Sequence, residues 1–117
     1  MTINRDALEP LVRALGGYPA VQKDGLQFSG VGDARFQEID PGTLLWSWGE
    51  RRPGERGKAA LAYYDLDGQI VSVGLLADGN EVKEIELWRG DGTALLSVPS
   101  KDDLWEMVPG HTYSPRS

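Results

Sequence analysis

Cysteine is absent from the 117 residues, and histidine occurs once, as His111. The lack of cysteine excludes disulfide bonds, thiolate metal ligands and a cysteine nucleophile. A single histidine excludes a multi-histidine metal site, and no Gly-x-Ser-x-Gly sequence provides a serine nucleophile. The glycine-rich stretches do not have the spacing of nucleotide-binding loops. The sequence therefore predicts no metal, no cofactor and no hydrolytic triad.

Long hydrophobic runs and an excess of positive charge are also lacking. No apolar segment approaches the ~20 residues that cross a bilayer, and the first residues contain no apolar signal region. Twelve basic and eighteen acidic residues give a net charge of −6, whereas nucleic-acid binders need a basic surface to displace counterions from phosphates. We expect a cytoplasmic protein that binds neither membranes nor nucleic acid.

The charge is unevenly distributed along the chain. Residues 65–106 hold ten acidic and three basic residues, a net charge of −7, whereas residues 50–58 hold four basic and two acidic residues. An acidic surface keeps a protein soluble, and it can also steer a basic partner by long-range attraction. The composition agrees with both interpretations.

An amphipathic helix is predicted near the N-terminus. Leu8, Leu11 and Leu15 recur at helical spacing, so these side chains should be buried together on one face. Asp6 precedes this stripe at the position of an N-cap. The glycine pair at residues 16–17 is expected to end the helix in the left-handed conformation.

After this helix the hydrophobic period changes to two, which is typical of β-strands. The candidate strands are residues 26–30, 35–39, 43–48, 59–64, 70–76, 82–88 and 93–98. Asp-Gly pairs, which are favoured in tight turns, lie at residues 67–68, 78–79 and 91–92. Consecutive hairpins of this kind indicate an antiparallel sheet.

These elements predict an α+β fold in a single domain, residues 1–110, followed by a flexible C-terminal tail, residues 111–117. An antiparallel β-meander of roughly five to seven strands carries the N-terminal helix on one face. We expect the helix to lie on the face of Ser72 and Gly74, where small side chains give it room. Ser100 and Asp103 have the spacing of a capping box, which predicts a short C-terminal helix at residues 101–107.

Four tryptophans are many for a chain with two phenylalanines. Trp46 and Trp48 share one strand face and are expected in the core. Trp88 shares a strand face with Glu84 and Glu86, which leaves two interpretations. Either Trp88 is a binding anchor, since tryptophan is enriched at interface hot spots, or the N-terminal helix covers it as part of the core.

A candidate partner-binding surface combines this strand face with the adjoining turns. Side chains 84, 86 and 88 must project together if the strand is regular. The candidate residues are Asp78, Glu81, Glu84, Glu86, Trp88 and Asp91. Such a surface attracts a basic partner electrostatically and anchors it through one aromatic side chain.

Residues 84–99 resemble a pattern found in small bacterial proteins. In that pattern a Glu-x-Asp/Glu-x-Trp strand turns through an aspartate and returns to a leucine and a proline. The matching residues are Glu84, Glu86, Trp88, Asp91, Leu95 and Pro99. Some proteins with this pattern look like immunity proteins encoded beside secreted toxins, and the resemblance implies no catalytic residues. Gly90 and Gly92 depart from the pattern, which has bulkier residues at these positions.

We therefore expect a non-enzymatic protein-binding protein of the immunity or antitoxin type, which blocks a basic toxin domain through its acidic face. One alternative is a small structural or regulatory domain. Another is a carboxylate-dependent hydrolase that uses Glu84 and Glu86, because glycoside cleavage needs only two acids at a suitable separation. A deep pocket with converging carboxylates would favour the enzyme, whereas a flat acidic face with an exposed tryptophan would favour protein binding.

Overall fold

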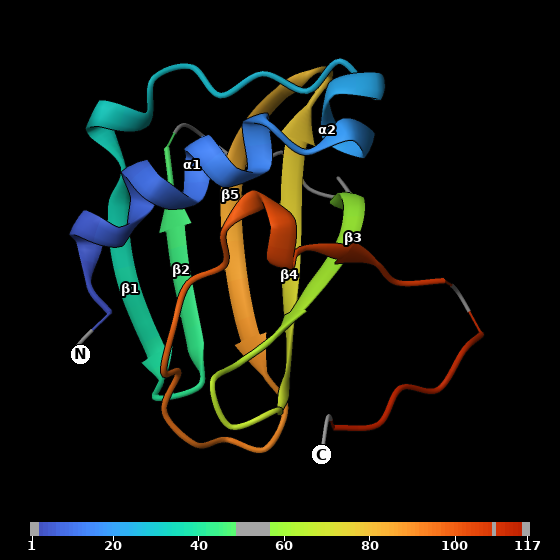
Figure 1. Ribbon diagram of the computed structural model, residues 1–117. Helices are drawn as coiled ribbons and strands as arrows, with labels where there is room; N and C mark the ends of the chain where they lie inside the picture. The colour runs from blue at the N-terminus through green and yellow to red at the C-terminus, as the bar shows by residue number, and fades with distance from the viewer. Residues whose placement is uncertain (1–2, 49–56, 109, 116–117) are drawn as a thin grey trace.

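The computed structural model describes residues 3–48, 57–108 and 110–115, and most of the basic stretch 50–58 lies outside them. The chain begins with a 3₁₀ turn, η1 (Arg5–Ala7), which leads into helix α1 (Leu8–Gly16) and the short helix α2 (Pro19–Lys23). Both helices lie across the same side of a β-sheet (Figure 1). Among the described residues, no helix has the length and apolar character needed to cross a membrane.

The ends of the first helix differ from the prediction. Asn4 rather than Asp6 provides the cap, because its Oδ1 accepts the Asp6 N–H at 2.9 Å. Gly17 keeps a right-handed conformation, with φ −86° and ψ −8°. Pro19 then occupies the first turn of α2, where its missing N–H has no intrahelical partner to lose.

Six strands form one antiparallel sheet in the order β1-β2-β5-β4-β3-β6. They are β1 (Arg35–Asp40), β2 (Thr43–Ser47), β3 (Gly57–Tyr64), β4 (Ile70–Asp78), β5 (Glu81–Arg89) and β6 (Trp105–Glu106). The predicted α+β class, with an N-terminal helix on an antiparallel sheet, is confirmed. The meander is interrupted, however, because β2 pairs with β5 and not with β3.

Two predicted strands do not join the sheet as strands. Residues 26–30 contribute one isolated bridge, between Gln27 and Glu81. Residues 93–98 instead cross the side of the sheet that carries the helices (Figure 1). Their backbone N–H groups donate to partners outside the strands: the Leu95 N–H donates to the Pro41 carbonyl at 3.2 Å, and the Leu96 N–H donates to the Asp65 carboxylate at 3.0 Å. Local alternation therefore overpredicted strand content in both segments.

The predicted C-terminal helix is reduced to a single 3₁₀ turn, η3 (Lys101–Asp103), which is followed by β6. Its capping box is confirmed, since the Ser100 N–H and hydroxyl both donate to the Asp103 carboxylate at 3.0 Å. Strand β6 then pairs with β3, so the backbone after the turn bonds to the sheet edge instead of continuing a helix.

Helix α1 packs on the face opposite to the predicted one. Ser72 and Gly74 point away from it, and the helix covers the face of Val71 and Val73 instead. We call this the covered face; its buried side chains include Leu44, Trp46, Leu61, Tyr63, Val71, Val73, Leu75, Ile85 and Leu87. Burial of this large apolar area outweighs the room that small residues offer on the other face.

The core predictions for individual side chains are confirmed. The three leucines of α1 are buried against the covered face: Leu8, Leu11 and Leu15. Trp46 and Trp48 are buried as well, and Trp46 packs its ring against Phe36 with centroids 5.2 Å apart. The hydrophobic core therefore lies between α1 and the covered face of the sheet.

We expect Leu11→Ala to lower the free energy of unfolding by about 2–5 kcal/mol, because it leaves a cavity under α1. Leu66→Ala is the matched control, since Leu66 is 79% exposed, and it should change stability by about 0.5 kcal/mol or less. Urea denaturation of the two variants measures both values. Equal effects would contradict the packing of α1 described here.

Candidate functional site

Trp88 projects from β5 on the face that α1 leaves uncovered. It lies directly opposite Thr43 on β2 and Ser72 on β4, and 51% of its surface is exposed. A helix on the Ser72 face would have covered the indole, so the true position of α1 accounts for its exposure. The interpretation of Trp88 as a core residue beneath the helix is therefore wrong.

Glu84 and Glu86 project from β5 on the same face as Trp88. Glu86 lies opposite Leu45 on β2 and Gly74 on β4, and Glu84 lies opposite Ser47 and Leu76. Both glutamates are half-buried. The predicted alternation of the strand is thus confirmed, and we call Glu84, Glu86 and Trp88 the open-face strip.

The other candidate residues do not surround this strip as one rim. Asp78 and Glu81 face each other at the β4–β5 turn, whereas Asp91 follows the opposite end of β5. A strand of this length separates its two ends by about 30 Å. Glu81 also accepts a hydrogen bond from the Ser29 hydroxyl. The structure therefore brings residues 84, 86 and 88 together and divides the turn residues between the two ends.

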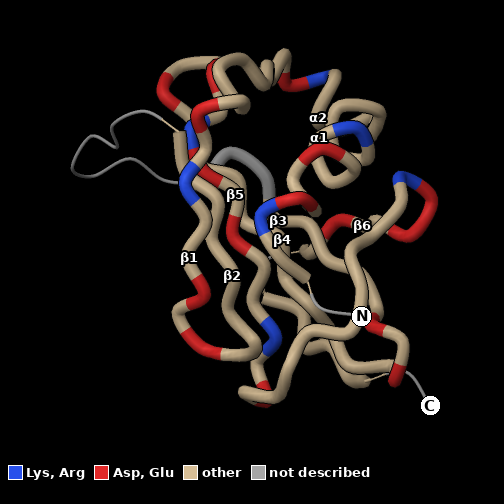
Figure 2. The backbone as a smooth tube through the Cα atoms, turned by 90° about the vertical axis from the view of Figure 1, so that its left-hand side faces the viewer, with Lys and Arg blue, Asp and Glu red and all other residues tan. Residues whose placement is uncertain are grey.

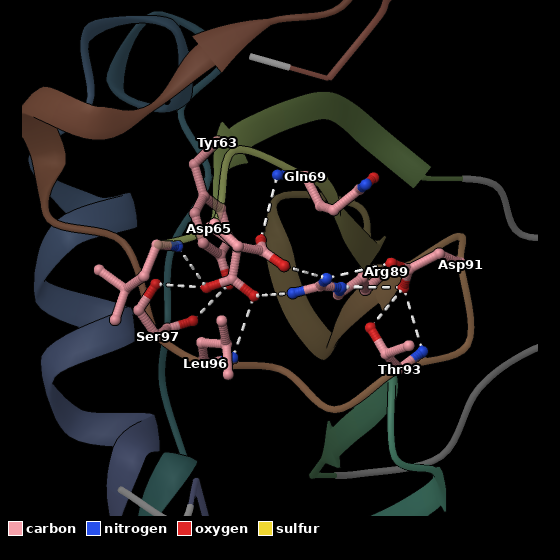
Figure 3. Close-up of polar contacts among 10 residues, drawn as sticks. Tyr63, Asp65, Gln69, Arg89, Asp91, Thr93, Leu96 and Ser97 are labelled. Carbon is pink, nitrogen blue, oxygen red and sulfur yellow. Dashed lines mark hydrogen bonds and ion pairs between the residues drawn. The ribbon is translucent and has the colours of Figure 1, made fainter. Parts of the chain in front are cut away.

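The turn residue Asp91 belongs to a polar cluster around Arg89, which sequence analysis did not single out (Figure 3). Arg89 points into the covered face, and its side chain is 4% exposed. Its Nη1 donates to Asp65 Oδ2 at 2.9 Å, and its Nε donates to Asp91 Oδ1 at 2.9 Å. Its Nη2 donates to Asp67 and to Asp91 Oδ2. We call these four residues the Arg89 cluster.

The carboxylate of Asp65 extends the cluster to the chain that crosses the covered face. Its Oδ1 accepts the Ser97 hydroxyl at 2.7 Å, and its Oδ2 accepts the Leu96 N–H at 3.0 Å. The Tyr63 hydroxyl donates to the Ser97 carbonyl at 2.7 Å. Residues 96–97 are therefore held by hydrogen bonds to β3 and its turn, and not by a strand neighbour.

Hydrogen bonding within the cluster favours the charged forms of Arg89, Asp67 and Asp91. Bonds from Arg89 hold the pKa of Asp91 well below its usual range, with a further contribution from the Thr93 N–H, and they also lower the pKa of Asp67. Bonds to Asp91 and Asp67 raise the pKa of Arg89. Burial raises the pKa of Tyr63, which therefore stays a neutral hydrogen-bond donor.

One sequence signal could have revealed this cluster. Arg89 follows Ile85 and Leu87 at a spacing of two, so it belongs to the apolar face of its strand. An arginine at such a position is almost never buried unless it is paired. The nearby Asp-Gly turns, at residues 67–68 and 91–92, offered the carboxylates.

We expect Arg89→Ala to lower the free energy of unfolding by about 3–5 kcal/mol, because Asp65 would remain buried without its cation. Arg13→Ala is the control: Arg13 pairs with Glu9 at 3.8 Å on the exposed face of α1, and loss of that pair should cost less than about 1 kcal/mol. Chemical denaturation checks both. A small effect at Arg89 would contradict its role as the link between the turns.

Stability should also depend on pH through Asp67 and Asp91. Because folding lowers their pKa values, their contribution is complete above about pH 4, the ordinary aspartate range, and is lost as the pH falls further. Thermal melts from pH 7 to pH 2 should therefore show a steep fall of Tm in acid. Asp91→Asn should lower Tm at pH 7 and make the further fall in acid smaller. The control is Asp33→Asn, which replaces an exposed carboxylate outside the cluster and should leave the dependence of Tm on pH unchanged. An equally unchanged dependence in Asp91→Asn would refute the role of Asp91 in the acid loss of stability.

Two hollows border Trp88 on the open side of the sheet. A shallow one of about 210 Å³ follows the strip and is lined by residues including Gly74, Glu86 and Trp88. A second, of about 430 Å³, lies between Trp88 and residues near the C-terminus, Met107 and residues 111–115. The indole also lies against Gly90, where a Cβ would be 3.4 Å from Cη2. A small residue at this position leaves space for the tryptophan ring.

A third hollow, of about 550 Å³, lies beside α1 and away from the open-face strip. It is lined by Asp6 and Glu9 together with Arg5 and Arg13, so two acidic side chains are balanced by two basic ones. Within residues 3–48, 57–108 and 110–115, no three histidine or acidic side chains gather in a way that could hold a metal ion.

Comparison with protein-family models, with curated protein sequences and with solved structures gives no match to this chain.

Proposed function

We propose that this chain is a non-enzymatic protein-binding protein of the immunity type, which covers a basic toxin domain with the open face of its sheet. The observation that carries the proposal is the half-exposed Trp88 on β5, one of the two central strands of the sheet, beside Glu86 on the same face.

The position of Trp88 suits a binding anchor. Tryptophan gives the largest contact area of any side chain and dominates many interfaces. Here the indole projects from a strand paired on both sides, so little conformational entropy remains to be lost when a partner covers it. The core lies on the opposite face and does not require this ring.

The charge of the strip suits a basic partner. Glu84 and Glu86 lie in line with Trp88, and the surrounding stretch 65–106 has a net charge of −7. Acidic positions outnumber basic ones along the strands and turns of the backbone (Figure 2). The electric field of an acidic surface raises the rate of association with a cationic surface, and this effect weakens as ionic strength rises.

The hydrolase alternative has less support. Glu84 and Glu86 project side by side from one strand, and of the two only Glu86 lines a hollow described above, which is shallow. Acid-base cleavage places its two carboxyl groups on either side of the scissile bond. A row of acids on an open sheet face fits electrostatic recognition better than it fits this arrangement.

The function is tested by co-expression with the product of the adjacent gene. We expect that product to be a basic protein that arrests growth when expressed alone, and we expect the present chain to restore growth by forming a complex with it. A harmless neighbour, or growth arrest that persists when both proteins are made, would overturn the proposal.

The surface is tested with variants of that complex. Glu84→Lys with Glu86→Lys should slow association and flatten its salt dependence, whereas Asp24→Lys with Asp33→Lys, which makes the same charge change on exposed residues off the strip, should have a smaller effect. Trp88→Ala should speed dissociation by about 30-fold, equivalent to about 2 kcal/mol, and keep a Tm near that of the native chain. Stopped-flow kinetics measures both rates. A large loss of Tm with unchanged affinity in the folded fraction would refute the anchor.

A further inference from the structure

Met107 and residues 111–115, near the C-terminus, form one wall of a groove on the open face. Met107 lies over β4, where its sulfur accepts a weak hydrogen bond from the Ser72 hydroxyl at 3.8 Å. Tyr113 packs on Trp105 with ring centroids 4.9 Å apart, and its hydroxyl accepts the Val108 N–H at 2.7 Å. These contacts fix this wall opposite Trp88, and the hollow of about 430 Å³ lies between them.

The lining of this groove combines aromatic and apolar walls with one acidic end. Its main residues are Gln69, Trp88, Asp91, Met107, His111 and Tyr113. No lysine or arginine occurs among the described residues that line it. Flat aromatic and thioether surfaces of this kind accept a hydrophobic stem, and the aromatic faces attract a cation.

The acidic end of the groove is more negative than Asp91 alone suggests. Asp91 belongs to the Arg89 cluster, in which three carboxylates surround one guanidinium and leave a net charge of −2. Asp65 is fully buried and Arg89 nearly so, so the fold itself holds this cluster in place, and Asp91 is its member that lines the groove. The electrostatic complement of the groove is therefore a cation.

We propose that this groove receives an arginine side chain of the basic partner, with its guanidinium stacked on Trp88 and facing the Asp91 end. The inference rests on the proposed function, because it names the group by which the partner is recognised. Arginine fits better than lysine, since its planar guanidinium stacks on aromatic faces and is less strongly hydrated than an ammonium group. The three methylenes of its stem lie along Met107.

The experiment uses the full chain and small probes, so that it does not require the partner. Nα-acetyl-arginine amide is titrated into the ¹³C,¹⁵N-labelled protein at low salt, with the citrulline amide as the neutral isostere and the lysine amide as the second cation. The signals followed are the Trp88 indole N–H, the His111 ring and the Met107 methyl. We expect saturable shifts at these three positions, with an affinity for arginine about 2- to 5-fold above that for citrulline and also above that for lysine.

The matched variants are Trp88→Leu and Leu66→Ala. Trp88→Leu keeps an apolar contact and removes the aromatic face, so the preference for arginine over lysine should disappear at His111 and Met107. The charge of the Asp91 end should still favour either cation over citrulline. Leu66→Ala, on the exposed β3–β4 turn, should bind like the native chain. Equal affinity for citrulline, equal affinity for lysine, or shifts spread over the acidic residues without saturation would each overturn the arginine site.

The two proposals fail in distinguishable ways. If the arginine probe does not bind but the reversal at Glu84 and Glu86 still slows association with the partner, only the arginine site is refuted. If the probe binds but co-expression gives no rescue, the toxin-inhibitor function is refuted and the groove remains a guanidinium site.

Discussion

The guanidinium of Arg89 is the constraint on which the rest of this structure depends. A buried arginine must have its donors satisfied and its charge balanced, and here aspartates from two separate turns do so. One of them, Asp65, uses its remaining lone pairs on Leu96 and Ser97. The same ion pair therefore joins β5, the β3–β4 turn and the chain that crosses the covered face.

The burial of Arg89 also agrees with the face of the sheet that remains open. Arg89 and Trp88 are neighbours on one strand, so a strand that buries the arginine must turn the tryptophan outward. Residues 93–98 follow the arginine onto the covered face and complete, with α1, the layer over the apolar side chains. With that layer on one side of the sheet, the open-face strip lies on the side that α1 leaves uncovered.

Local patterns predicted the parts of the fold that local physics controls. The leucine spacing of α1, the alternation within β5 and the capping box at Ser100 each involve residues a few positions apart, and all three are confirmed. The face chosen by α1 and the path of residues 93–98 were predicted wrongly. The first depends on apolar area summed over several strands, and the second depends on hydrogen bonds from Asp65, some thirty positions away. Neither quantity is visible in a window of sequence.

The candidate site, like the fold, was predictable only where residues a few positions apart control it. Alternation alone placed Glu84, Glu86 and Trp88 together, but it could not show that Asp91 is bound to an arginine. That pairing does not remove Asp91 from the electrostatics of the surface. Three carboxylates share one guanidinium, so the cluster that links the turns also leaves a fixed negative charge at one end of the groove beside Trp88. In the site that we propose, folding and recognition use the same carboxylate of Asp91, so a substitution there must be judged by stability and by binding together.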